Sequence, residues 1–189
     1  TQILMDIASK ENGIVVGTGD LSEMALGWCT YNGDQMSMYG VNGSVPKTVI
    51  PNILRAAECA YFTQDGLRQC LEDVISTPVS PELLPTDQNG EISQKTQDLI
   101  GPYVLHDFFL YHLLFSGFDK EKIEYLANVA FESEYDSDTV KQWLDKFFKR
   151  FFAQQFKRSC MPDGVAVTPL SLSPRGAWNM PSTIDASNF

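Results

Sequence analysis

The sequence predicts an α/β arrangement near its amino-terminal end, followed by a largely helical remainder. Two observations support this class. A short β-branched run, Ile14-Val15-Val16, is followed at once by Gly17-Thr18-Gly19-Asp20, the order expected for a buried parallel strand, a tight turn and a helix. After residue 100, apolar residues recur at helical spacing. The strands are too few to complete a sheet, which suggests part of a larger α/β domain.

Each element follows from local patterns. Ile3, Leu4, Ile7 and Ala8 keep helical spacing at the start of the chain. A helix is expected from Leu21 through Trp28, and further ones from Ser44 and Pro46 onwards and through 67–74. Three more are predicted near 102–116, 119–132 and 137–157, before an irregular tail over 161–189. The stretches 31–46 and 77–93 are predicted to be loops, and long loops are usually functional or disordered.

Composition limits the classes of partner. The 189 residues carry a formal charge of -10 and are 43% hydrophobic, which fits one globular domain and disfavours general binding to nucleic acid or anionic membranes. The most apolar run, Tyr103–Phe115, is too short to cross a bilayer. The four cysteines, Cys29, Cys59, Cys70 and Cys160, form no metal or disulfide pattern. We therefore expect free thiols and a cytoplasmic protein.

Three side chains around the Gly17–Asp20 turn suggest a magnesium-nucleotide site. Thr18 offers a hydroxyl, Glu23 a carboxylate and Lys47 a cation at a helix start. Each also has a plainer interpretation. Asp20 and Glu23 have the spacing of a capping box, which would leave Glu23 less free for a metal. Lys47 could be a solvated surface lysine, although a cation in the first turn of a helix opposes the helix dipole unless a phosphate binds there.

The run GTGDLSEMALGWCTYNGDQMSMYGVNGSVPKT, residues 17–48, resembles the signature of glutamine-dependent NAD+ synthetases. The order and spacing of Thr18, Glu23, Asp34 and Lys47 also resemble those of the ammonia-dependent enzymes. TPVSPELLP, residues 77–85, resembles a mobile loop near the ATP phosphates, with Ser80 as a phosphate contact. QFKRSCMPDG and PRGAWNMPS resemble the family's C-terminal signature, with Lys157 as a substrate contact. From the residues alone, Ser80 caps a turn, and Lys157 complements a helix C-terminus.

The resemblance implies a partial adenine-nucleotide-hydrolase-like (PP-loop, Rossmann-like) domain and an ATP-dependent ligase. Such an enzyme adenylates nicotinic acid adenine dinucleotide, and ammonia from glutamine then displaces AMP to give NAD+. Lys47 would clamp phosphates as the catalytic residue, Thr18 and Ser80 would bind ATP, and Glu23 would bind Mg²⁺ or the dinucleotide. Trp28 and Tyr31, with Lys157, would contact the dinucleotide, although aromatic side chains are more often core.

The match is not complete. An S-G-G-x-D-S pyrophosphate loop and a glutaminase domain do not occur in these 189 residues, and Ala177 and Asn179 stand where relatives often carry charges. We expect residues 1–189 to be the C-terminal portion of a synthetase domain, inactive alone and part of a homo-oligomer. Two alternatives stay open. The segment could be a non-catalytic assembly module that uses Phe147, Phe148, Phe151 and Phe152, or it could belong to another PP-loop amidotransferase such as GMP synthetase.

Overall fold

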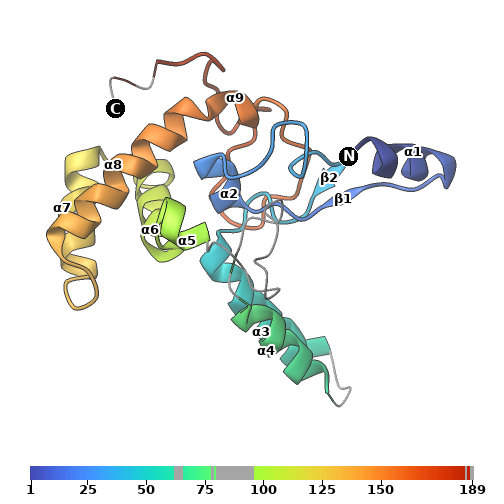
Figure 1. Cartoon of the computed structure of the whole chain (residues 1–189), viewed down its shortest axis with the longest axis horizontal. Helices are drawn as coiled ribbons and strands as arrows, with labels where there is room; N and C mark the ends of the chain where they lie inside the picture. Colours follow the sequence, from blue (N-terminus) through green and yellow to red (C-terminus); the bar gives the residue numbers. More distant parts are fainter. Residues whose placement is uncertain (62–65, 78, 80–95, 186, 188–189) are drawn as a thin grey trace, which may run out of the picture.

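A computed structural model of the chain describes residues 1–61, 66–77, 79, 96–185 and 187. The elements follow in the order α1 (Gln2–Lys10), β1 (Val16–Gly17), α2 (Leu21–Leu26), β2 (Tyr39–Gly40), a 3-10 turn η1 (Lys47–Val49), α3 (Ile50–Tyr61), α4 (Leu67–Ser76), α5 (Thr96–Ile100), α6 (Tyr103–Leu114), α7 (Lys120–Ala130), α8 (Ser137–Ala153) and α9 (Gln155–Arg158). Helix α1 projects from one side of the body, and the α3–α4 hairpin projects from another (Figure 1).

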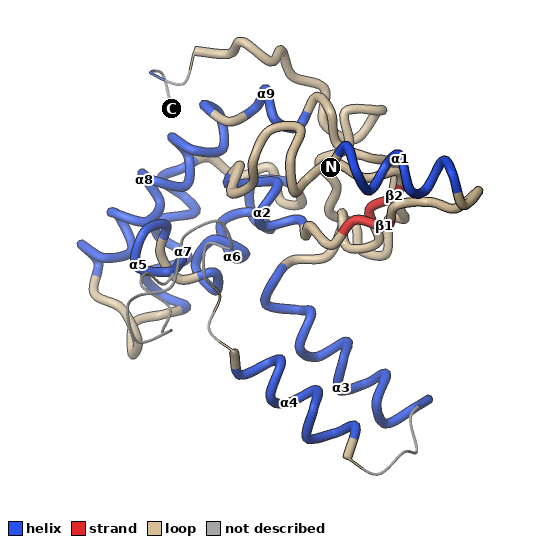
Figure 2. The backbone as a smooth tube through the Cα atoms, turned by 45° about the vertical axis from the view of Figure 1, so that its right-hand side comes forward, coloured by secondary structure: helices blue, strands red, loops and turns tan. Residues whose placement is uncertain are grey.

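The core lies between the short helix α2 and the helices α6, α7 and α8, which pack against one another. Its interior is rich in phenylalanine, and the rings of Phe109, Phe147 and Phe151 are fully buried. Helix α8 crosses over α6 and α7, and α2 fills the space beside them (Figure 2). The four phenylalanines 147, 148, 151 and 152 are all buried, so the suggestion that they form an assembly surface is wrong and the alternative, that they are core, is confirmed.

The sheet is smaller and more exposed than the sequence predicts. β1 is parallel to β2, with Val16 opposite Tyr39 and Gly17 opposite Gly40. The strand therefore begins two residues later than Ile14, and the predicted loop 31–46 contains a strand. Ile14 and Val16 are 66% and 50% exposed, so the expectation of a buried strand is wrong for this chain.

Most helices are where the sequence predicts them, and α5 was not predicted. The helix expected over 137–157 is interrupted at Gln154, which ends α8 and precedes α9. The interruption coincides with a close approach of Gly27, where any Cβ would overlap the Gln154 side chain and where the backbone has a φ of 58°. The loop 77–93 lies almost entirely outside the described residues, as does Ser80.

The C-terminal tail returns to the sheet. The amide of Gly40 donates to the carbonyl of Asp163 at 2.7 Å, and Leu170 and Leu172 are buried in the core. All four cysteines are free, as expected. In the part of the chain that the structure describes, every helix falls short of the length and apolar character required to cross a membrane.

Candidate functional site

Lys47 lies between two carboxylates at the N-terminus of α2. Its Nζ is 2.7 Å from Asp20 Oδ2 and 3.0 Å from Glu23 Oε1. Asp20 and Glu23 also form the predicted capping box: the amide of Glu23 donates to Asp20 Oδ1, and the amide of Asp20 donates to Glu23 Oε2. Glu23 is therefore bonded through both oxygens, and Lys47 is not a solvated surface lysine. The capping interpretation is confirmed, and the capped carboxylates are the partners of Lys47.

Burial and charge oppose each other in this group. Burial raises the pKa of Asp20, and the Lys47 ammonium only partly offsets it. Burial and the neighbouring Asp20 also raise the pKa of Glu23. Burial alone would lower the pKa of Lys47, but the two carboxylates together raise it. One ammonium thus serves two carboxylates in a half-buried position, an arrangement that favours the arrival of further cationic charge.

A third carboxylate, Asp107 of α6, lies beneath this group and was not predicted as a site residue. Its Oδ2 accepts from the amide and the hydroxyl of Thr48 at 2.9 and 2.7 Å, and its Oδ1 accepts from the Ser22 hydroxyl. Ser22 Oγ in turn accepts from the amide of Lys47 at 2.8 Å. The only sequence signal was an acid inside the apolar run 103–115. Asp107 therefore joins α2, η1 and α6 at one point.

Tyr103, one turn before Asp107, lies beside the same group. Lys47 Nζ is 5.4 Å from the centre of its ring. Burial and the three nearby carboxylates raise the pKa of its phenol. The hydroxyl is buried and has no hydrogen-bond partner among the described residues. A buried donor of this kind is available to a ligand or to a part of the protein that is not described.

A hollow open to solvent lies at the carboxyl end of β1, and its lining residue Gly19 directly precedes Asp20. Gly17 and Gly19 line one side, the loop with Gln35 and Ser37 lines another, and the tail from Met161 to Ser173 closes it. Thr18 is exposed between the two lining glycines. Gly164 allows the tail to approach, because a Cβ there would overlap the Gly40 carbonyl. None of the described residues that line the hollow is charged, so it suits an uncharged ring or sugar better than a phosphate.

The other end of α2 carries three cations. The Arg158 guanidinium donates to the carbonyls of Met24 and Ala25 at 3.2 and 3.0 Å, and also to Phe151. Arg150 donates to Leu26 and Gly27, and Lys157 Nζ donates to Gly27 and Cys29 at 2.9 and 2.6 Å. These cations complement the C-terminal dipole of α2. The interpretation that Lys157 complements a helix C-terminus is therefore confirmed, and the helix is α2.

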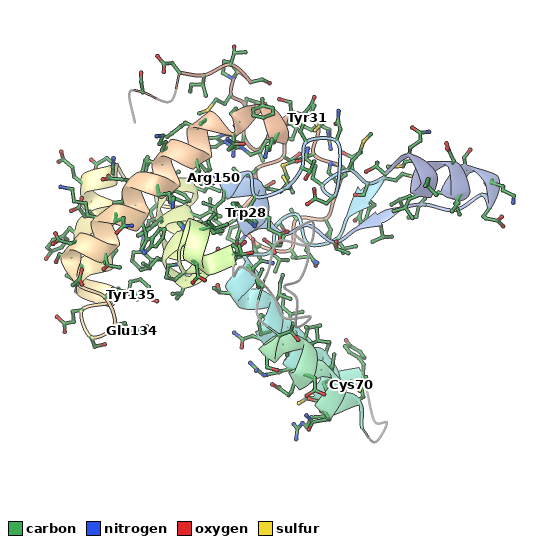
Figure 3. All side chains as sticks on the ribbon, viewed as in Figure 1. Trp28, Tyr31, Cys70, Glu134, Tyr135 and Arg150 are labelled. Carbon is green, nitrogen blue, oxygen red and sulfur yellow. The ribbon has the colours of Figure 1, made fainter. Side chains whose placement is uncertain are left out.

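Trp28 and Tyr31 lie at this same C-terminal end (Figure 3). The Arg150 guanidinium lies 5.2 Å from the Trp28 ring, which packs against the core. Tyr31 is half-exposed, and its ring centre is 5.5 Å from that of Phe156. The structure therefore brings Lys47 and Glu23 together, places Thr18 beside the hollow, and puts Trp28, Tyr31 and Lys157 at the opposite end of α2.

The donor set at Asp20 and Glu23 fits a Mg²⁺ ion only if other ligands complete it. The described residues contain no group of three or more His, Cys, Asp or Glu side chains able to hold a metal. Mg²⁺ prefers hard oxygens and often takes one or two carboxylates together with substrate phosphates. Glu23 would be the ligand that this chain offers such an ion, and Lys47 would keep its contact with Asp20 Oδ2.

A family model and several curated relatives match this chain, and they name the same kind of enzyme. Residues 1–153 match the family model described as NAD synthase. Curated glutamine-dependent NAD(+) synthetases of Mycobacterium tuberculosis (strain ATCC 25618 / H37Rv) and Mycobacterium leprae are 40% and 37% identical over 205 residues, covering 98% of this chain and 30% of each relative. The chain therefore spans less than a third of these relatives.

A solved structure has the same fold. The crystal structure of a glutamine-dependent NAD(+) synthetase from Cytophaga hutchinsonii superimposes with a TM-score of 0.69 at 17% identity, covering 97% of this chain and 27% of that chain.

Proposed function

This chain belongs to the NAD synthase family, and on that basis we propose that it forms part of a glutamine-dependent ligase that converts nicotinic acid adenine dinucleotide to NAD+. Residues 1–189 would be the C-terminal portion of its synthetase domain. A PP-loop half with the remainder of a Rossmann-like sheet, and a glutaminase domain supplying ammonia, would come from further polypeptide. The exposed apolar side chains of α1, of β1 and of the segment between them support this, among them Ile3, Leu4, Ile7, Ile14 and Val16.

The reaction needs an activated carboxylate. A carboxylate on the nicotinate ring is a poor electrophile, so its oxygen attacks the α-phosphorus of ATP, pyrophosphate departs, and an acyl adenylate forms. Ammonia then attacks the acyl carbon and AMP leaves, carrying the bonding electron pair. Negative charge develops on the phosphates in the first step, and preorganised cations stabilise it.

The observation that carries the proposal is the Lys47 ammonium, held by Asp20 and Glu23 in a position with access to solvent. We assign Lys47 as the phosphate clamp and Glu23 as a ligand of Mg²⁺ or a contact of the dinucleotide. Mg²⁺ would neutralise phosphate charge there when bound. With Mg²⁺ and a nucleotide bound, Glu23 would serve as the ligand of the metal and the Lys47 ammonium would contact the phosphates, with Asp20 as its remaining carboxylate partner.

Further residues are assigned around this centre. Thr18 and Ser80 would bind ATP, and the uncharged hollow beside Thr18 suits a ring or sugar. Trp28, Tyr31 and Lys157 would contact the dinucleotide from the opposite end of α2. The three are within one connected region, since Lys157 donates to the carbonyl of Cys29 between Trp28 and Tyr31. The complete enzyme would be a homo-oligomer in the cytoplasm.

The test compares this chain with the full-length protein that contains it. The full-length protein should form NAD+ from nicotinic acid adenine dinucleotide, ATP, Mg²⁺ and ammonia, and also from glutamine. The chain alone should form none, because the PP-loop half is proposed to lie elsewhere. NAD+ formation by the chain alone would contradict the domain assignment, and failure of the full-length protein would contradict the function.

A second reading, a non-catalytic assembly module, is favoured only by the exposed apolar side chains of α1 and β1. Calorimetric titration of the chain with Mg²⁺ and a non-hydrolysable ATP analogue separates the two readings. Binding that Lys47→Ala abolishes supports the nucleotide site, whereas association of the chain without nucleotide binding supports assembly.

A further inference from the structure

Two side chains of α6 lie close to Lys47: Tyr103 beside its ammonium, and Asp107 in contact with Ser22 and Thr48. Tyr103 and Asp107 are four residues apart, so they share one face of that helix. The Tyr103 ring lies near the ammonium, and Asp107 binds the backbone below it through Ser22 and Thr48. A single helix of the core thus places Tyr103 beside the ammonium and links Asp107 to the Lys47 amide indirectly, through the Ser22 hydroxyl.

Asp107 is the acceptor in each of its hydrogen bonds with Ser22 and Thr48. Ser22 and Thr48 supply three donors to its two oxygens, and the carboxylate accepts all of them. The Ser22 hydroxyl gives its proton to Asp107 and can therefore accept from the amide of Lys47. Asp107 is 8% exposed, and water has little access to replace these contacts. Only an acceptor with two oxygens satisfies all three donors.

We infer that Asp107 is a positioning residue, which ties η1 to α2 and thereby fixes the Lys47 ammonium between Asp20 and Glu23. The inference rests on the proposed function only for its effect on catalysis, because the positioning itself concerns Lys47 in the protein as it stands. Asp107 touches neither the ammonium nor the hollow among the contacts described, so its influence passes through the Lys47–Thr48 backbone.

Asp107→Asn is the primary variant. Asparagine keeps the shape of the side chain but replaces one acceptor oxygen with an NH2 group, which cannot accept from the Ser22 hydroxyl or from the Thr48 donors. In the full-length protein we expect kcat to fall about 30- to 100-fold with KM for ATP within about threefold, because a displaced clamp loses transition-state contacts more than ground-state binding. In a Lys47→Met background the same substitution should change kcat less than about threefold, because residues that act through one another are not additive. Equal losses in both backgrounds would overturn the inference.

A chemical readout keeps the test independent of NAD+ formation. Lysine acetylation with acetic anhydride, followed by mass spectrometry, reports how tightly Lys47 is held relative to the exposed Lys141. We expect Asp107→Asn to speed the reaction of Lys47 about tenfold, because an amine released from ion pairs is a better nucleophile. An unchanged rate in the folded variant would overturn the inference even if the protein made no NAD+. Failure of the proposed function would appear as an inactive wild type with this acetylation result unaffected.

Two further variants separate positioning from general loosening. Asp136→Asn makes the same chemical change at the N-cap of α8, where the carboxylate accepts from Thr139, and it should leave Lys47 acetylation and kcat unchanged. Should Asp107→Asn not fold, Thr48→Val removes one donor while keeping the amide, and it should speed Lys47 acetylation about threefold. A folded Thr48→Val protein with wild-type acetylation, or an Asp136→Asn protein with faster acetylation, would contradict the inference.

Discussion

The two ends of helix α2 are both covered by charge, but in different ways. At the N-terminus, Lys47 is shared by two carboxylates and its side chain is 21% exposed. At the C-terminus, Arg158 is fully buried and donates to backbone carbonyls and the Gln155 side chain. A carboxylate can exchange its cation for another, whereas a carbonyl inside the protein has no alternative partner. The N-terminal end is suited to a ligand, and the C-terminal end fixes the helix that presents it.

The largest expected effect comes from removing the exchangeable cation. Lys47→Met should lower kcat for NAD+ formation in the full-length protein about 10³-fold, as loss of one preorganised charge at developing negative charge typically does. Steady-state kinetics with ATP and the dinucleotide measure it. Lys120→Met, at a surface ion pair with Asp145, is the matched control and should keep wild-type kcat. A Lys47→Met enzyme within tenfold of wild type would remove Lys47 from the clamp role.

Removing the fixed cation should act on stability instead. Arg158→Met removes the side-chain donor of the Ala25 and Phe151 carbonyls and one of the two donors of the Met24 carbonyl, which also accepts from the amide of Gly27. We expect a loss of about 3 kcal/mol in the free energy of unfolding, since each buried unpaired group costs about 1–3 kcal/mol. Urea titration measures it. Arg55→Met, which breaks an exposed ion pair with Glu72, serves as control and should leave the urea midpoint unchanged. Similar urea midpoints for Arg158→Met and Arg55→Met would contradict the stabilising role of Arg158 at the C-terminus of α2.

Lys157 lies between the two cases, because its ammonium holds the carbonyls of Gly27 and Cys29 next to the proposed dinucleotide contacts. Lys157→Met should raise KM for the dinucleotide about tenfold, equivalent to about 1.4 kcal/mol of binding, with a smaller change in KM for ATP. A loss of stability with both KM values unchanged would assign Lys157 to the helix terminus alone.

The smallest effect is a difference in pH dependence. Without Lys47, the raised carboxyl pKa values of Asp20 and Glu23 should rise further, because a favourable charge is lost. A carboxyl group whose pKa is higher folded than unfolded destabilises the native state when ionised, and this cost begins to shrink as the pH falls through the folded pKa and is gone below the unfolded pKa. The stability deficit of Lys47→Met should therefore shrink as pH is lowered from 7 towards the ordinary values of 3.8 and 4.5. Arg158→Met removes no partner of a carboxylate, so its deficit should stay constant over that range.

The helices could largely be predicted because their signals are local. The apolar spacing of α6, α7 and α8 and the Asp20–Glu23 capping pair are visible in a few consecutive residues. Strand β2 was missed because Tyr39–Gly40 is only two residues long and is defined by its partner β1. The end of α8 at Gln154 was missed for a related reason, since it coincides with the approach of Gly27, more than 100 residues away in sequence.

The candidate site divides in the same manner. Lys47 and Glu23 were predicted from residue type and spacing, and the structure brings them together with Asp20. Asp107 was not predicted, because its role depends on donors from Ser22 and Thr48 in distant segments. The hollow could not be predicted from the sequence either. Its glycines and serines come from the loop and the tail, and such residues indicate a site only when the fold brings them together.

The contact between the tail and β2 joins segments of the chain that are synthesised at different times. During synthesis the segment with Gly17 and Gly40 leaves the ribosome long before the segment from Met161 to Ser173, and the two together line the hollow. Domains generally fold as units while they are made, from the N-terminal side first. The segments with Gly17 and Gly40 are therefore made before the segment from Met161 to Ser173, which supplies the remaining wall of the hollow.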